Sequence, residues 1–468
     1  MIYLFLYFLC VLGVILAFSR KFVKVGSEEY TVYGRRGGVF EIAMSLVALV
    51  FGASSVFGLA GWGYKLGWNA IWWTLSGVIF LVVLGIFFAK VIYSLRGVTI
   101  IDVIEGNYGR AIRGLSSFVL LVAWISVLAG QIIAGGNITQ IVVGDKILSF
   151  IVFALIFGIY TFVWGQVGAI KTSFLQVLLM VVGIGLIFYL VFSKAGYSPK
   201  LLMNAEFGIS EKFSLSLLLT VFTSVGLSYL FGPDIYSRIF SSKDSSIARK
   251  AVLLSAFLIL VISFFIVAVG VLSRAVFSNV ENPDNIIPIF SLSLVPEEAK
   301  PLVLVALISI PLSGADVILV TATAVLSRNL LPSIFGEKRI FENVWFIRVV
   351  SALVILVATV VAVFGKGIIP TLLIAYKVFS STVAPIVFSS LLIKLLRREV
   401  VIPKSRKILM FSLLSVTTLY ILLCEILPFL QIPNYTLYVL FINTVVSLIA
   451  TFWRVREGHI GIFSVERK

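Results

Sequence analysis

The chain is poor in charged residues and contains very little histidine or cysteine. Charged residues make up 12% of its 468 residues, and hydrophobic residues make up 60%. A soluble domain needs roughly 25% charged residues to cover its surface, so lipid must cover this chain instead. The single histidine, His459, argues against most histidine-based metal sites and proton relays. The two cysteines, Cys10 and Cys424, imply no disulfide framework.

Long apolar runs make up most of what is present. About thirteen runs approach the roughly 20 residues that a spanning helix needs, and no short alternating segments of a β-barrel are visible. Backbone polar groups in hydrocarbon must be paired internally, so we expect an all-α membrane protein. The first run has no positive charge before it and a basic stop, Arg20 and Lys21, after it, which predicts a retained helix. The predicted spans lie near 2–18, 39–63, 70–95, 115–141, 147–164, 169–193, 213–231, 250–275, 299–326, 346–364, 368–396, 407–431 and 436–454.

The net charge of +16 comes from lysines and arginines that sit in short loops. Such loop charges predict topology rather than nucleic-acid binding. With the N-terminus outside, the loops on the inner side hold most of these residues, among them Arg35, Arg96, Arg113, Arg328 and Arg397. We therefore expect a single integral-membrane domain over 1–468, multi-pass in the inner cell membrane, with the N-terminus outside and the C-terminus inside.

Two clusters of small and polar residues lie at matching depth in spans five helices apart. Gly52-Ala53-Ser54-Ser55 is in the middle of 39–63, and Thr223-Ser224-Val225-Gly226 is in the middle of 213–231. The pair predicts two helices unwound at the midplane, where free carbonyls and amides bind ions and polar groups. Close helix packing by small residues is the alternative for either cluster alone.

The opposite orientations of these two spans favour an inverted five-plus-five repeat. We expect an extra N-terminal helix and loop at 2–38, a first repeat at 39–193, a second at 213–396, and two C-terminal helices at 407–454.

Four segments resemble the sodium:solute symporter family, and the similarity is closest to its proline/pantothenate-type branch. They are Glu28-Glu29-Tyr30 through Gly34-Arg35, Gly58-Leu59-Ala60-Gly61 with Tyr64 and Gly67, Gly168 through Gln176, and Tyr229, Pro233 and Arg238 with Ser242-Lys243-Asp244. The resemblance implies a LeuT-like fold in which solute and Na⁺ bind near the midplane and two bundles rock to alternate access.

The resemblance also implies a cation site made of oxygen atoms. Its carbonyl positions correspond to Ala48, Phe51 and Ile310, and its two hydroxyl positions correspond to Ser313 and Gly314. Gly314 carries no hydroxyl, which weakens the expectation of Na⁺ as the coupling ion.

Two more expected carboxylates are replaced, by Val50 and by Ser173. Asp316 lies three residues after Ser313 on nearly the same helix face, and a charge at membrane depth is a functional candidate. Asp316 would complete the cation site or carry a proton. Lys171 lies near the altered Ser173 position and would place an ammonium where Na⁺ would sit. The alternatives for Lys171 are an ion pair with Asp316 or a side chain that reaches the interface.

The expected solute-binding residues come from the two predicted breaks. They are Ser54, Ser55, Thr223, Ser224 and Tyr229. Arg238 is expected either to hold the cytoplasmic gate or to be a loop cation near lipid headgroups. The resemblance disfavours a sugar and favours a small amino acid, carboxylate or osmolyte.

These observations predict a secondary active symporter that moves a small organic solute with a cation, Na⁺ in the first instance. A proton-coupled transporter, an uncoupled transporter and a transporter-fold sensor are the alternatives. No metal motif, catalytic carboxylate pair or phosphate loop suggests an enzyme or a cofactor. The expected partners are the solute and the lipid bilayer, with no nucleic acid and no obligate protein partner.

Overall fold

A computed structural model describes residues 25–277, 280–287, 293–365, 368–396, 402–427, 430, 432 and 434–452. The expected N-terminal helix at 2–18 lies outside these residues. The helices are α2 Ser27–Val32, α3 Val39–Val50, α4 Leu59–Leu66, α5 Trp72–Val83, α6 Ala89–Ser94, α7 Ile101–Tyr108, α8 Arg110–Val143, α9 Lys146–Trp164, α10 Gln166–Lys194, α11 Pro199–Met203, α12 Leu215–Phe231, α13 Pro233–Ser241, α14 Ser245–Val276, α16 Lys300–Val325, α17 Leu331–Phe335, α18 Val344–Phe364, α19 Ile368–Leu395, α20 Lys404–Ile426 and α21 Tyr435–Phe452.

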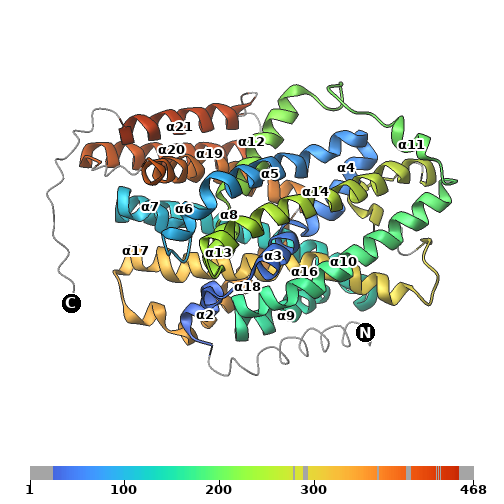
Figure 1. Ribbon diagram of the computed structural model, residues 1–468, viewed down its shortest axis with the longest axis horizontal. Coiled ribbons are helices and arrows are strands. Elements are labelled where there is room, and N and C mark those ends of the chain that lie inside the picture. Colours follow the sequence, from blue (N-terminus) through green and yellow to red (C-terminus); the bar gives the residue numbers. More distant parts are fainter. Residues whose placement is uncertain are drawn as a thin grey trace.

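The helices form one bundle whose long axis lies horizontally in Figure 1. Eleven segments of the described chain are long and apolar enough to cross a membrane. They coincide with predicted spans, except that Ser55–Ser94 combines two of them and the short helix Val39–Val50 stands apart. The prediction of a polytopic all-α membrane protein is therefore confirmed.

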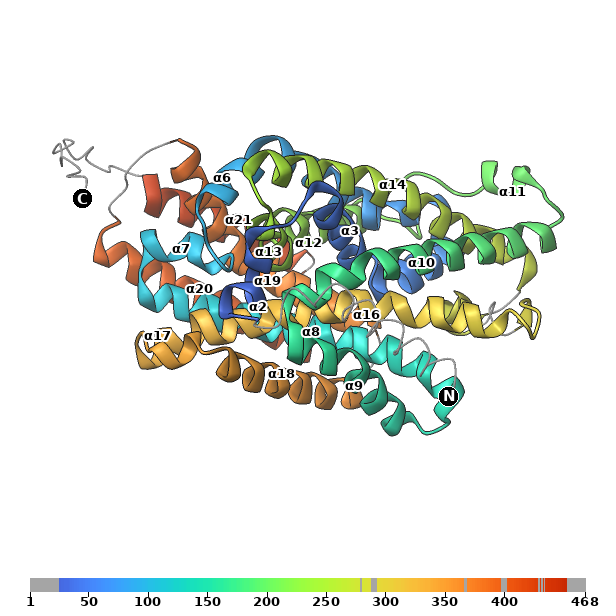
Figure 2. The same cartoon turned by 60° about the horizontal axis from the view of Figure 1, so that its bottom comes forward.

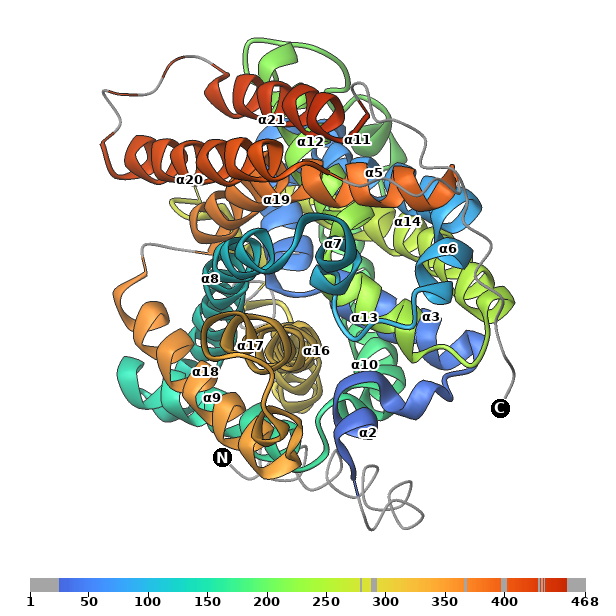
Figure 3. The ribbon, with the colours of Figure 1, turned by 90° about the vertical axis from the view of Figure 1, so that its left-hand side faces the viewer.

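Helix α16 lies inside the bundle and the C-terminal helices lie at its edge. In Figure 3, α16 is surrounded by α8, α10, α13 and α18, which all contact it. The most apolar window of α16 is 89% buried, whereas the corresponding windows of α18 and α20 are each 33% buried. Figure 2 shows α9 and α18 together along one outer side. The burial of α16 suits a helix that carries Ser313 and Asp316.

The first core helix is broken at the depth that the sequence predicts. Helix α3 ends at Val50, and Phe51 has φ −86° and ψ 47°, which is not helical. The chain resumes at η2 Ser54–Gly58, a π-helical turn that leads into α4. A Cβ atom at Gly52 would meet the Gln131 amide at 2.5 Å, so a larger residue there would displace that amide from its hydrogen bond with Ala53. The break leaves carbonyls of the last turn of α3 without helical partners.

The second predicted break is in the wrong place. Helix α12 continues without interruption through Thr223 and Ser224, and the chain leaves the helix only at Gly232, with φ −62° and ψ 126°. Pro233 then begins α13. Proline has no N–H to continue a helix and favours the first helical position, so the Gly232-Pro233 pair places the break.

The inner halves of the two broken helices are joined by their backbones. The amide of Gly37 donates to the Ser241 carbonyl at 2.9 Å, and the amide of Lys243 donates to the Gly37 carbonyl at 3.0 Å. Arg35 adds a hydrogen bond to the Phe240 carbonyl at 3.3 Å. The start of α3 and the end of α13, far apart in sequence, therefore form one local unit.

Candidate functional site

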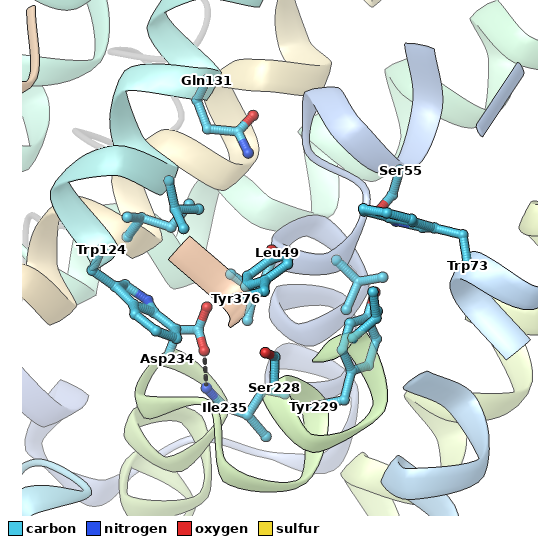
Figure 4. Close-up of a pocket in the computed structure, with 14 residues that line it drawn as sticks. Leu49, Ser55, Trp73, Trp124, Gln131, Ser228, Tyr229, Asp234, Ile235 and Tyr376 are labelled. Atoms are coloured by element: carbon cyan, nitrogen blue, oxygen red, sulfur yellow. Dashed lines mark hydrogen bonds between the residues drawn. The ribbon is translucent and has the colours of Figure 1, made fainter. Parts of the chain in front are cut away.

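A small cavity lies beside the break in the first core helix (Figure 4). Its volume is about 30 Å³, which is enough for about two water molecules. A solute of ten or so heavy atoms therefore needs the surrounding helices to move apart. The lining residues are Leu49, Val50, Ser55, Trp73, Trp124, Val127, Gln131, Val225, Ser228, Tyr229, Asp234, Ile235, Ile318 and Tyr376.

The structure divides the residues predicted to bind solute. Ser55 and Tyr229 line the cavity, from η2 and α12. Thr223 and Ser224 do not, and the Thr223 hydroxyl donates back to the Leu219 carbonyl of its own helix at 2.8 Å. The side chain of Ser54 lies outside the described part of the structure.

The predicted cation-site oxygens of α3 and α16 lie together. The Ser313 hydroxyl is 2.9 Å from the Ala48 carbonyl of α3 and 2.8 Å from the Ile310 carbonyl of its own helix. Phe51 sits at the break three residues after Ala48 and is completely buried. Three oxygen atoms from two helices thus meet beside the cavity, whose wall includes the adjacent Leu49.

The space beside Gly314 is filled by Gln131 of α8. A Cβ atom at Gly314 would lie 3.1 Å from the Gln131 amide carbon. The same amide oxygen accepts a hydrogen bond from the Ala53 amide at 2.8 Å, inside the helix break. Gln131 therefore stabilises the break. A residue larger than glycine at position 314 would require the Gln131 side chain to move.

Asp316 is fully buried one turn after Ser313. One of its oxygens accepts hydrogen bonds from the Tyr160 hydroxyl at 2.7 Å and from the Gln176 amide at 3.5 Å. Within the described part of the chain its other oxygen accepts no hydrogen bond, and the Gln176 carbonyl oxygen nearby also has no hydrogen-bond partner there. A buried carboxylate with a free oxygen is costly, and it is suited to hold a cation or a proton.

Arg238 is inside the protein, which corrects the alternative of a loop cation near lipid headgroups. It lies in α13 and is completely buried. Its guanidinium donates to the hydroxyls of Ser45 in α3 and Ser237, both at 2.9 Å. The predicted span ends at residue 231, but a second helix, α13, starts directly after the Gly232 break and carries Arg238.

Lys171 and Ser173 lie on α10, at the inner end of the first broken helix. Lys171 forms an ion pair with Glu41 of α3 and lies 5.5 Å from the ring centroid of Tyr33. It therefore pairs with Glu41 and not with Asp316. The Ser173 hydroxyl is buried and donates to the Ala169 carbonyl at 2.6 Å.

Comparison with known proteins identifies the family. The profile of the sodium:solute symporter family matches residues 30–399. The chain belongs to the sodium:solute symporter family. A sodium/pantothenate symporter of Haemophilus influenzae is 26% identical over 377 residues, which cover 75% of each protein. This agrees with the predicted proline/pantothenate-type branch.

Other similar proteins share the family or the fold but differ in their named substrates. The human high affinity choline transporter 1 is 25% identical over 374 residues, covering 73% of this chain and 63% of that protein. A solved structure of a Na⁺-coupled sialic acid symporter in a substrate-bound outward-open state matches with a TM-score of 0.78 over 96% of each chain, at 14% identity. That likeness shows the LeuT-like fold. Membership of the sodium:solute symporter family makes this chain a solute symporter, but relatives with different named substrates match it.

Four prominent cavity residues were not among the sequence candidates for this symporter. They are Trp124, Gln131, Asp234 and Tyr376. Asp234 carried a detectable signal, since an acidic residue directly after Pro233 lies within an apolar segment. The other three look like ordinary residues of apolar helices, and only the fold brings them to the cavity.

Proposed function

We propose that this protein is a Na⁺-coupled symporter of a small organic solute in the inner cell membrane, with the cation held at Ser313. The observation that carries the proposal is the meeting of the Ser313 hydroxyl with the Ala48 carbonyl at the helix break. Backbone carbonyls at such breaks coordinate Na⁺ in transporters built on inverted repeats. Phe51, Ile310 and Asp316 complete the proposed oxygen set, and Gly314 contributes only its backbone.

The cation site and the solute cavity share the broken helix. Ala48 supplies a proposed ligand, while the next two residues, Leu49 and Val50, line the cavity. A cation that draws α3 and α16 together therefore fixes one wall of the cavity. This shared wall supports coupling of the two binding events, because each one stabilises the same arrangement of α3.

Arg238 and Lys171 are proposed to hold the inner end of the pathway closed. Arg238 links α13 to α3 through Ser45, and Lys171 links α10 to α3 through Glu41. Both links must change if α3 moves relative to its neighbours during alternating access.

The test is solute uptake into proteoliposomes with an inward Na⁺ gradient, compared with a pH gradient alone. We expect the Na⁺ gradient to drive accumulation. Ser313→Ala should raise the Na⁺ concentration for half-maximal uptake by about tenfold, the equivalent of about 1.4 kcal/mol. Ser309→Ala is the matched control, because Ser309 is a buried serine of α16 that hydrogen-bonds only within its own helix. Uptake that ignores Na⁺ in the unmodified protein would refute Na⁺ coupling.

Proton coupling through Asp316 is the second candidate. It is favoured by the free oxygen of that buried carboxylate. Under this function a pH gradient alone drives uptake, and Ser313→Ala leaves uptake unchanged.

A further inference from the structure

The cavity contains a single formal charge, and it is negative. Among the lining residues that the structure describes, Asp234 is the only ionisable carboxylate and there is no lysine or arginine. Figure 4 shows the Asp234 side chain directed into the cavity from the start of α13. One of its oxygens accepts a hydrogen bond from the Ile235 amide at 3.0 Å.

The nearest basic residue is Arg238, which interacts electrostatically with both Asp316 and Asp234. Arg238 lies one turn after Asp234 in α13, and its guanidinium donates to Ser45 and Ser237. It does not line the cavity. A bound anionic group would therefore face the Asp234 carboxylate with no basic side chain on the cavity wall, in surroundings where charge repulsion is poorly screened.

Aromatic rings form much of the remaining wall. Trp73, Trp124, Tyr229 and Tyr376 come from four different helices and surround the space that Asp234 enters (Figure 4). Trp73 and Trp124 are each almost completely buried. Ring faces attract cations, most strongly when water is excluded, and several rings together favour ammonium and methylated ammonium groups.

We propose that the transported solute presents a positively charged ammonium or quaternary ammonium group to Asp234 and these four rings. The proposal rests on the proposed function, since it takes this cavity to be the solute site of the symporter. It narrows the expected solute class by excluding solutes whose only charge is a carboxylate.

The position of Asp234 at a helix start offers a way to separate charge from structure. An acidic side chain there also stabilises α13 through the helix dipole. Asparagine makes similar local hydrogen bonds at a helix N-terminus but carries no charge. Asp234→Asn therefore removes the proposed counter-charge with little loss of local structure.

The experiment measures thermal unfolding of the purified full-length protein with four probes, each with and without Na⁺. Choline and ethanolamine carry quaternary and primary ammonium groups, 3,3-dimethylbutan-1-ol is the uncharged isostere of choline, and pantothenate is an anion. A ligand that binds the folded state raises the unfolding temperature. We expect at least one cation to do so, and neither the isostere nor pantothenate.

Variants connect the effect to the cavity. Asp234→Asn should weaken the affinity for the stabilising cation at least tenfold, and Asp234→Glu should retain part of it. Asp145→Asn is the matched control, because exposed Asp145 is also an aspartate at a helix start, accepting a hydrogen bond from the Leu148 amide at 2.7 Å, but does not line the cavity. It should bind as the unmodified protein does.

Each outcome bears on one proposal. The ammonium proposal is overturned if neither cation raises the unfolding temperature, if pantothenate raises it more, or if Asp234→Asn leaves cation affinity unchanged. A stabilising effect of Na⁺ alone keeps the symporter proposal even then. Binding of choline or ethanolamine that does not depend on Na⁺ keeps the ammonium proposal and removes Na⁺ coupling.

Discussion

Asp316 and Ser313 contribute different oxygen atoms to the proposed cation site. Ser313 brings a neutral oxygen to the Ala48 carbonyl, whereas Asp316 brings a buried negative charge one turn away. The Asp316 oxygen bound by Tyr160 is held in place, and the other has no hydrogen-bond partner. The free oxygen is the one available to a cation.

Replacing Asp316 with asparagine tests the charge at this position. The Tyr160 hydroxyl can still donate to the asparagine carbonyl, so the fold should persist. We expect Asp316→Asn to raise the half-maximal Na⁺ concentration for uptake at least tenfold, because a nearby opposite charge is lost. Tyr160→Phe is the comparison: it should destabilise the protein by about 1–3 kcal/mol and keep Na⁺ dependence. Unchanged Na⁺ dependence with a lost pH dependence in Asp316→Asn would instead identify a proton site.

The residues of the site were predictable to the extent that they follow a linear motif. Ser313, Ala48 and Ile310 follow the family pattern, and the structure brings them within hydrogen-bonding distance. Gln131 and Tyr376 follow no motif, because their positions beside the helix break depend on how α8 and α19 pack. Packing between distant helices leaves no local signal in a chain that is apolar throughout.

The two helix breaks also differ in how well the sequence predicts them. The Gly52 region marks its break through small residues, and the structure confirms it. The second cluster lies in a continuous helix, where a Cβ atom at Gly226 would meet the Phe80 ring at 2.4 Å, and the second break comes at Gly232. Backbone chemistry at a Gly-Pro pair is a stronger indicator of an interrupted helix than small size alone.

The contact between α4 and α14 depends on the absence of side chains. A Cβ atom at Gly270 of α14 would lie 2.1 Å from the Ala60 carbonyl of α4. Gly270→Ala should therefore destabilise the protein by about 1–3 kcal/mol through overpacking. Gly185→Ala is the control, since no atom lies within 4 Å of its added Cβ, and alanine favours a helix by about 1 kcal/mol. Thermal unfolding in detergent measures both, and equal unfolding temperatures would contradict the expected clash.

At the scale of the whole molecule, charged groups gather at one end of the bundle. Arg113 of α8 pairs with Glu337 at 2.8 Å, which ties the segment after α16 to α8, and Arg328 pairs with Glu342 at 3.2 Å within that segment. Arg35 donates to the Arg96 carbonyl at the same end at 2.9 Å. The predicted topology makes this the cytoplasmic end. The polytopic fold was predictable because lipid imposes long apolar helices, whereas their packing order was predictable only through the family resemblance.

The backbone link at Gly37 has a consequence for amide hydrogen exchange. The Gly37 amide is bonded to the Ser241 carbonyl, and the Lys243 amide is bonded to the Gly37 carbonyl. Separating the two segments would therefore break both hydrogen bonds together. The two amides should exchange with solvent deuterium at similar slow rates, as members of one cooperative unit. Mass spectrometry of peptides from the two regions, with and without Na⁺, measures this. Protection that changes in one peptide and not in the other would show that the start of α3 and the end of α13 move separately.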